Sequence, residues 1–127
     1  MLLVAGWALF GWPTLAFAGP LIVAEAVITT AVADLEPVDA VQSYPAAVGK
    51  LFCFTRVVGA QEESVISHVW YRGEAEMGRT VLPVRAAVWR TWSVRTFLPS
   101  AAGEWRVAIV DAEGTELLSL PFTLTDQ

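Results

Sequence analysis

The residue of this 127-residue chain best suited to acid–base chemistry is its single histidine, His68. An imidazole can act as a general base or a metal ligand near neutral pH. Metal ligation needs convergent partners, and neither a second histidine nor a local cysteine or carboxylate spacing accompanies it. We therefore expect His68 to be a partly buried imidazole, hydrogen-bonded beside Trp70. A small hydrolase centred on His68 is the alternative.

Other covalent chemistry finds little support in the sequence. The lone cysteine, Cys53, lies between Phe52 and Phe54, which predicts a buried, inert thiol and excludes a disulfide scaffold or a CxxC-type zinc site. No GxSxG segment is present, and the nine glycines are scattered singly, so no phosphate-cradling loop is indicated. We expect no catalytic residues, no metal and no cofactor, and hence no enzyme.

The span from Met77 to Gly103 holds four arginines and no acidic residue, although the chain carries a net charge of −5. Its centre reads WRTWSVR from Trp89 to Arg95. Guanidinium groups stack on indole rings and hold carboxylates and phosphates through paired hydrogen bonds. This pattern predicts a basic, aromatic-walled surface for an anionic or sugar-like ligand, or for a partner protein. The alternative places the tryptophans in the core and pairs the arginines with acids elsewhere.

These considerations define a candidate interaction surface drawn from three segments of the chain. Its members are His68, Trp70, Arg72, Trp89, Arg90, Trp92, Ser93 and Arg95.

The elements that must position these residues are short β-strands. Predicted strands cover residues 21–33, 50–58, 65–72, 79–88, 89–98, 104–110 and 115–125, where the fourth and fifth could instead be one long strand bent near Trp89. Alternation is clearest where Trp105, Val107 and Ile109 share one face. About seven strands in roughly 100 residues are typical of an immunoglobulin-like antiparallel β-sandwich, so the sequence predicts an all-β fold. Pro83 and Pro121 favour edge positions.

An apolar segment precedes this domain. No Asp, Glu, Lys or Arg occurs before Glu25, and the small residues Ala16 and Ala18 fit signal-peptidase cleavage after Ala18. An uncleaved membrane-anchor helix is the alternative, since roughly 20 apolar residues span a bilayer. We expect residues 1–20 to be a signal peptide or anchor and residues 21–127 to be the sandwich. Either way the domain is extracytoplasmic, because no basic residue follows the leader until Lys50.

Charge and composition exclude two broad classes of protein. The acidic balance, with a pI of about 4.7, argues against nucleic-acid binding, which depends on a basic surface. Intrinsic disorder is excluded because aromatic and β-branched residues are plentiful and the net charge is small.

Five segments between Ala26 and about Thr123 resemble the bacterial domain of unknown function family numbered 2914. They are Ala31-x-x-Asp34-x-Glu36-Pro37-x-Asp39, Phe52-x-Phe54-Thr55, His68-x-Trp70-Tyr71, Trp89-Arg90-Thr91-Trp92-Ser93 and Gly103-x-Trp105-Arg106-Val107. The resemblance implies a bacterial envelope protein whose immunoglobulin-like domain follows one or more membrane segments. It implies no catalytic residue and no cofactor.

We therefore expect a non-catalytic extracytoplasmic interaction module in the periplasm or cell envelope, acting as an accessory or structural subunit of a bacterial membrane-associated complex. Its partner would be a protein, with membrane contact through the N-terminus if that segment is uncleaved. The alternative is a soluble periplasmic domain that binds a ligand or glycan through Trp89, Arg90, Trp92 and Arg95.

Overall fold

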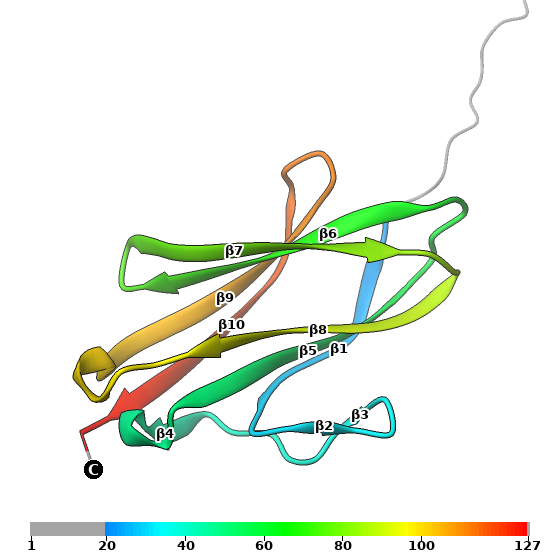
Figure 1. The fold of residues 1–127 in the computed structure, drawn as a ribbon. Coiled ribbons are helices and arrows are strands. Elements are labelled where there is room, and N and C mark those ends of the chain that lie inside the picture. The colour runs from blue at the N-terminus through cyan, green and yellow to red at the C-terminus, as the bar shows by residue number, and fades with distance from the viewer. Residues whose placement is uncertain (1–19, 127) are drawn as a thin grey trace, which may run out of the picture.

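The computed structural model describes residues 20–126, which form two facing β-sheets (Figure 1). The three-stranded sheet has the order β1 (Ile22–Thr29), β5 (Lys50–Val58), β8 (Val88–Thr96). The five-stranded sheet has the order β4 (Ser43–Pro45), β10 (Glu116–Thr125), β9 (Gly103–Asp111), β6 (Ser64–Arg72), β7 (Ala75–Val84). All pairings are antiparallel in these sheets except the short parallel contact of β4 with β10. The chain crosses between these two sheets after β1, β4, β5, β7 and β8, so the all-β sandwich is confirmed.

The seven long strands are those that the side-chain alternation predicts, with two differences. The fourth and fifth predicted strands are separate and belong to different sheets, since β7 ends at Val84 and β8 begins at Val88. The first predicted strand is shorter than expected and ends at Thr29, after which the chain forms a two-stranded hairpin of β2 (Val32–Ala33) and β3 (Glu36–Pro37).

The two prolines lie at edge positions of the sheet, where the absence of a backbone N–H donor is tolerated. Pro83 lies on β7, which is an edge strand, as predicted. Pro121 lies on β10, where β4 pairs only with residues 123–125 and leaves the preceding part of the strand as a local edge.

Apolar side chains between the sheets form two clusters. The larger is rich in aromatic rings: Phe97 and Trp105 meet edge to face with centroids 4.9 Å apart, and Trp70 meets Phe122 in the same way at 6.1 Å. The smaller cluster contains the fully buried Val57 and Ile109. The sheets also bury polar side chains, among them Thr55, His68 and Ser93.

A short 3₁₀ turn, η3 (Pro99–Ala101), links β8 to β9, and another, η2 (Ala46–Val48), precedes β5. Among residues 20–126, no helix has the length and apolar character needed to cross a bilayer. The predicted signal peptide or anchor falls almost entirely on residues 1–19, which lie outside the described part of the chain.

Candidate functional site

The structure separates the eight predicted interaction residues into three environments. His68, Trp70 and Ser93 are buried between the sheets, with exposed fractions of 0%, 2% and 5%. Trp89 packs against the smaller apolar cluster. The remaining four are at the surface or partly buried, and they divide into two pairs: Arg90 with Trp92, and Arg72 with Arg95. The eight residues therefore do not form one continuous patch.

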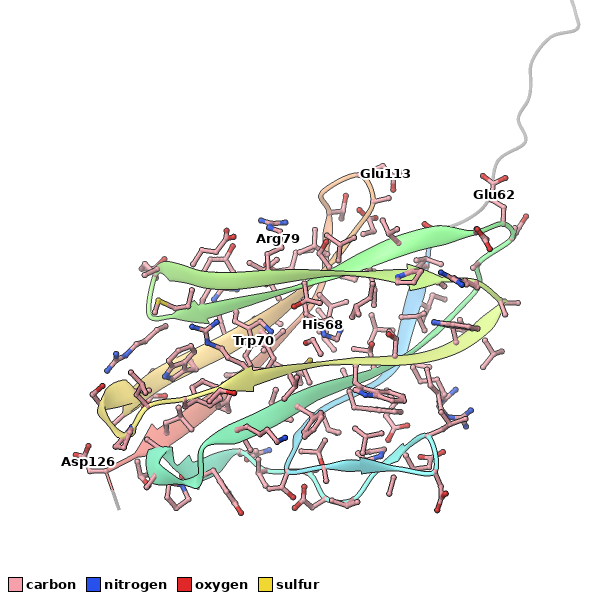
Figure 2. All side chains as sticks on the ribbon, in the orientation of Figure 1. Glu62, His68, Trp70, Arg79, Glu113 and Asp126 are labelled. Atoms are coloured by element: carbon pink, nitrogen blue, oxygen red, sulfur yellow. The ribbon has the colours of Figure 1, made fainter. Side chains whose placement is uncertain are left out.

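His68, which lies between the two sheets in Figure 2, is the centre of a hydrogen-bonded chain that joins them. Its Nδ1 atom lies 2.7 Å from the Oγ of Ser93 on β8, and its Nε2 atom lies 3.3 Å from the Oγ1 of Thr55 on β5. The Thr55 hydroxyl in turn donates to the carbonyl oxygen of Thr91 at 3.2 Å. Register explains the meeting, because Thr55 is paired with Thr91 and Cys53 with Ser93 across β5 and β8.

The direction of each hydrogen bond follows from the number of protons available. Thr55 has one hydroxyl proton, which it donates to Thr91, so its oxygen can only accept from Nε2–H of His68. Nδ1 is then the acceptor and Ser93 the donor. Burial disfavours the charged imidazolium and lowers the pKa of His68 from 6.5 to about 4. A neutral imidazole with Nε2 protonated satisfies every partner.

This arrangement suits a structural role better than a chemical one. A general base must reach the proton of a bound substrate, whereas His68 has no exposed surface and both ring nitrogens are engaged. The thiol of Cys53 is also fully buried, as predicted, and burial raises its pKa. Within residues 20–126, no group of three His, Cys, Asp or Glu side chains is placed to hold a metal ion.

Arg90 and Trp92 lie on the outer face of the three-stranded sheet. Trp92 stacks on the buried ring of Phe54 with centroids 6.3 Å apart, and Arg90 forms an ion pair of 3.2 Å with Glu36 on β3. This ion pair fastens the β2–β3 hairpin, which is cyan in Figure 1, to β8. Arg90 therefore serves to hold the hairpin, whereas Trp92 packs on β5 of its own sheet.

A group of hydrogen bonds among Thr29, Thr30 and Asp39 fixes the base of the same hairpin. The Asp39 carboxylate accepts hydrogen bonds from the hydroxyl of Thr29 at 2.7 Å, and from the backbone N–H and hydroxyl of Thr30 at 2.8 and 2.7 Å. The Thr29 hydroxyl is the largest reason that the pKa of Asp39 is lowered. Val38 N–H donates to the Ala31 carbonyl at 3.0 Å, which closes the base from the other side.

The tip of the hairpin has an unusual backbone. Asp34 and Leu35 have φ angles of +54° and +64°, the pattern of a two-residue turn with both central residues in the left-handed region. Asparagine and glycine are the usual residues there, because a branched or bulky side chain crowds its own backbone. Leu35 is nevertheless 56% exposed, and Val38 nearby in sequence is 54% exposed.

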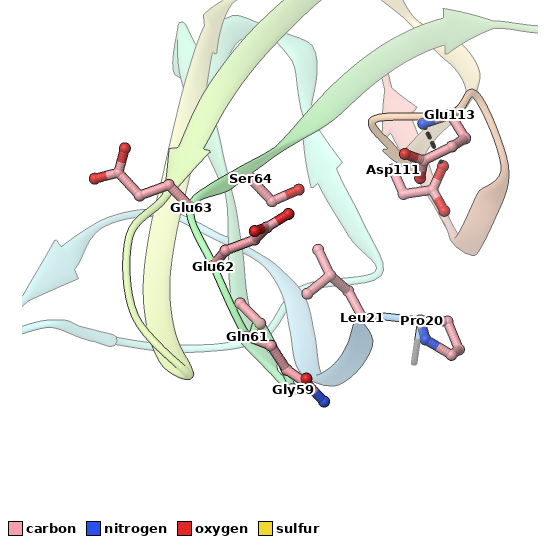
Figure 3. A pocket seen from close by; sticks show the side chains of 10 residues that line it. Pro20, Leu21, Gly59, Gln61, Glu62, Glu63, Ser64, Asp111 and Glu113 are labelled. Carbon is pink, nitrogen blue, oxygen red and sulfur yellow. Dashed lines mark hydrogen bonds between the residues drawn. The ribbon is translucent and has the colours of Figure 1, made fainter. Parts of the chain in front are cut away.

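Two cavities flank the ends of the sandwich. One of about 300 Å³ lies where Pro20 enters the fold and is lined by acidic residues, among them Glu62 and Asp111 (Figure 3). The Asp111 carboxylate is already used within its own turn, where it accepts from the N–H groups of Glu113 and Thr115. The other cavity, of about 260 Å³, contains Arg72 and Arg95.

Three residues of these sites were not predicted as site residues, although Thr55 and Asp39 lie in segments that carry the family resemblance. Thr55 carried a detectable signal, because a threonine at a core-facing position of an apolar strand requires a buried partner. Asp39 is a short acceptor after a proline-containing segment, a weak signal for a turn-stabilising carboxylate. No sequence signal marked Leu35, since leucine is rarely found in such a turn.

A protein-family model matches part of the chain. The family model described as "Protein of unknown function (DUF2914)" matches residues 63–124, which span β6 to β10 and include His68 and Ser93 but not Thr55 or the β2–β3 hairpin. No curated protein matches the chain.

Proposed function

We propose that this chain, which belongs to the DUF2914 family through residues 63–124, is a non-catalytic interaction module that binds a protein partner through its β2–β3 hairpin. In this proposal the module works outside the cytoplasm, as an accessory or structural subunit of a bacterial membrane-associated complex. Residues 1–20 either anchor it or are removed after Ala18.

The observation that supports the hairpin is the exposed leucine at its tip. An L-residue in the left-handed conformation costs about 1–2 kcal/mol, and leucine gains nothing from facing water. A residue that is costly in the isolated domain is explained if its side chain fills a pocket on a partner. Val38, which directly follows β3, would extend the apolar contact.

Rigidity adds to this support. The hairpin is held at its base by the hydrogen bonds that Asp39 accepts, and along its length by the Arg90–Glu36 ion pair. An element that is ordered before binding loses less conformational entropy when the complex forms. The hairpin therefore resembles a preformed recognition loop carried on a stable scaffold.

The non-catalytic part of the proposal is supported by the interior. The residue with the most suitable chemistry, His68, is sealed between the sheets as a neutral, fully hydrogen-bonded ring. Its hydrogen bonds link β5, β6 and β8, which points to a role in fixing the two sheets against each other.

Photocrosslinking from the hairpin tip tests the proposal. A benzophenone amino acid is placed at position 35 of the full chain in cells that express it naturally, and at position 113 in a matched protein. Glu113 is an exposed residue in the turn between β9 and β10, so it controls for random collision. We expect one discrete adduct from position 35, lost when Val38→Asp is added, and none from position 113. No adduct from position 35, or the same adducts from both positions, would contradict the proposal.

A further inference from the structure

Two arginines from opposite sheets converge at the end of the sandwich that carries η3. Arg72 is at the end of β6 and Arg95 near the end of β8, and both line the cavity of about 260 Å³. The rest of the lining is largely apolar, with Met77, Leu98 and Trp105 among its members. The cavity thus combines two cations with a surface suited to a small apolar group.

The Arg95 guanidinium is held in a defined position. It lies over the Trp105 ring, with 5.6 Å between the guanidinium carbon and the ring centroid. On its other side it occupies space that Gly78 leaves open, because a Cβ at position 78 would stand only 2.6 Å from Nη1 of Arg95. A glycine in the interior of β7 is unfavourable for a strand, and here it makes room for a cation.

Arg72 is oriented by the backbone of the neighbouring turn. Its Nη2 donates to the carbonyl oxygens of Ser100, at 3.2 Å, and of Ala102. These contacts use one nitrogen of the guanidinium group. The other N–H groups of Arg72, which lines the cavity, make no hydrogen bond to a described residue and are free to bind a ligand.

Neither cation has a carboxylate partner within residues 20–126. Arg56, Arg79, Arg90 and Arg106 each lie within 4.0 Å of a glutamate oxygen, in a chain with 13 acidic residues and 8 basic ones. By contrast, no described Asp or Glu forms such a pair with Arg72 or Arg95. The Nε of Arg95 is moreover buried without any hydrogen-bond partner in this part of the chain. A buried donor of this kind is expected to find an acceptor.

We infer that Arg72 and Arg95 form a binding site for the carboxylate of a small ligand that also carries an apolar group. Guanidinium groups bind carboxylates and phosphates alike. The carboxylate is favoured here because the Ser100 and Ala102 carbonyl oxygens beside Arg72 would repel a dianion, and because the lining is apolar. This site is independent of the hairpin proposal, since it uses different strands.

Calorimetric titration of the full chain in mild detergent tests the inference. N-acetylleucine is the probe, N-acetylleucine amide is its uncharged counterpart, and isobutyl phosphate is the phosphate counterpart. We expect N-acetylleucine to bind most tightly. Binding of the amide with equal affinity, tighter binding of the phosphate, or no heat from the carboxylate would overturn the inference.

Variants separate the site from the fold. Arg95→Gln should weaken the binding of N-acetylleucine about ten-fold or more, the loss expected for one charge-assisted hydrogen bond. Arg79→Gln is the matched control, because Arg79 is paired with Glu76 at the surface, and it should bind like the wild type. Gly78→Ala keeps every charge and only displaces the flexible end of Arg95, so it should also weaken binding while the protein stays folded. Unchanged affinity in both Arg95→Gln and Gly78→Ala would show that the cavity is not the site.

Discussion

The Nδ1 atom of His68 lies 2.7 Å from the Oγ of Ser93, which joins a strand of one sheet to a strand of the other inside an apolar core. Because the Thr55 hydroxyl completes the chain on the other side of the ring, this histidine is a neutral structural link. The pH dependence of stability and the effect of removing the Ser93 hydroxyl both follow from this link.

Because of His68, the free energy of unfolding should decrease as the pH is lowered. Its pKa is about 4 in the folded protein and about 6.5 in an exposed chain, so the unfolded state binds more protons between these values. The stability contribution is complete above pH 6.5 and is lost as the pH falls toward 4, by roughly 3 kcal/mol. Urea unfolding at a series of pH values measures this loss. His68→Gln removes the titration but leaves the carboxylates, so its curve should be flatter over this window; parallel curves would contradict the assignment.

Ser93→Ala should leave the Nδ1 acceptor of His68 buried without a donor. We expect the free energy of unfolding to fall by about 1–3 kcal/mol. Ser67→Ala, at a buried serine of β6 outside this network, is the control and should cost less. Nitrogen NMR of the imidazole in the wild type should find the proton on Nε2. A proton on Nδ1 would reverse the direction of the hydrogen bonds.

Two of the three tryptophans predicted to share one surface, Trp70 and Trp92, should differ in their effect on stability. Trp70 is 2% exposed and contacts two other aromatic rings, so Trp70→Ala should cost about 3–5 kcal/mol. Trp92 is only partly buried and stacks on Phe54, so Trp92→Ala should cost about 1–2 kcal/mol. Chemical denaturation compares the two, and equal losses would mean that Trp92 is a core residue.

The sequence is sufficient to predict the long strands because alternation is a local property. Trp105, Val107 and Ile109 occupy every second position of β9, and the structure leaves them 3%, 0% and 0% exposed. The break between β7 and β8 is harder to predict. It falls at residues 85–87, Arg-Ala-Ala, where neither glycine nor proline marks a turn.

The site is less predictable because it depends on pairing between distant strands. His68 meets Ser93 and Thr55 only once the register of β5 with β8 is fixed and the two sheets are stacked. The convergence of Arg72 with Arg95 likewise depends on where two strands of different sheets end. The β2–β3 hairpin escapes prediction for a local reason, since Asp34-Leu35 replaces the Asn-Gly type of turn that usually signals it.

Leu35→Gly should stabilise the isolated protein. Glycine adopts the φ of +64° without steric crowding. The backbone strain that is relieved exceeds the cost of the extra conformational entropy of the unfolded chain. We therefore expect the free energy of unfolding to rise by up to about 1 kcal/mol. Val38→Gly, directly after β3, is the matched control, because Val38 has no positive φ, and it should lower stability by about 0.5–1 kcal/mol. Thermal or urea unfolding compares both with the wild type.

The most direct test of the hairpin as a binding element is the fraction of full-length Leu35→Gly protein that remains in complex with its partner in mild detergent. We predict that this fraction falls well below the wild-type value at equal protein abundance, even though the variant is the more stable fold. A complex that survives Leu35→Gly unchanged would contradict the claim that this leucine is kept for binding.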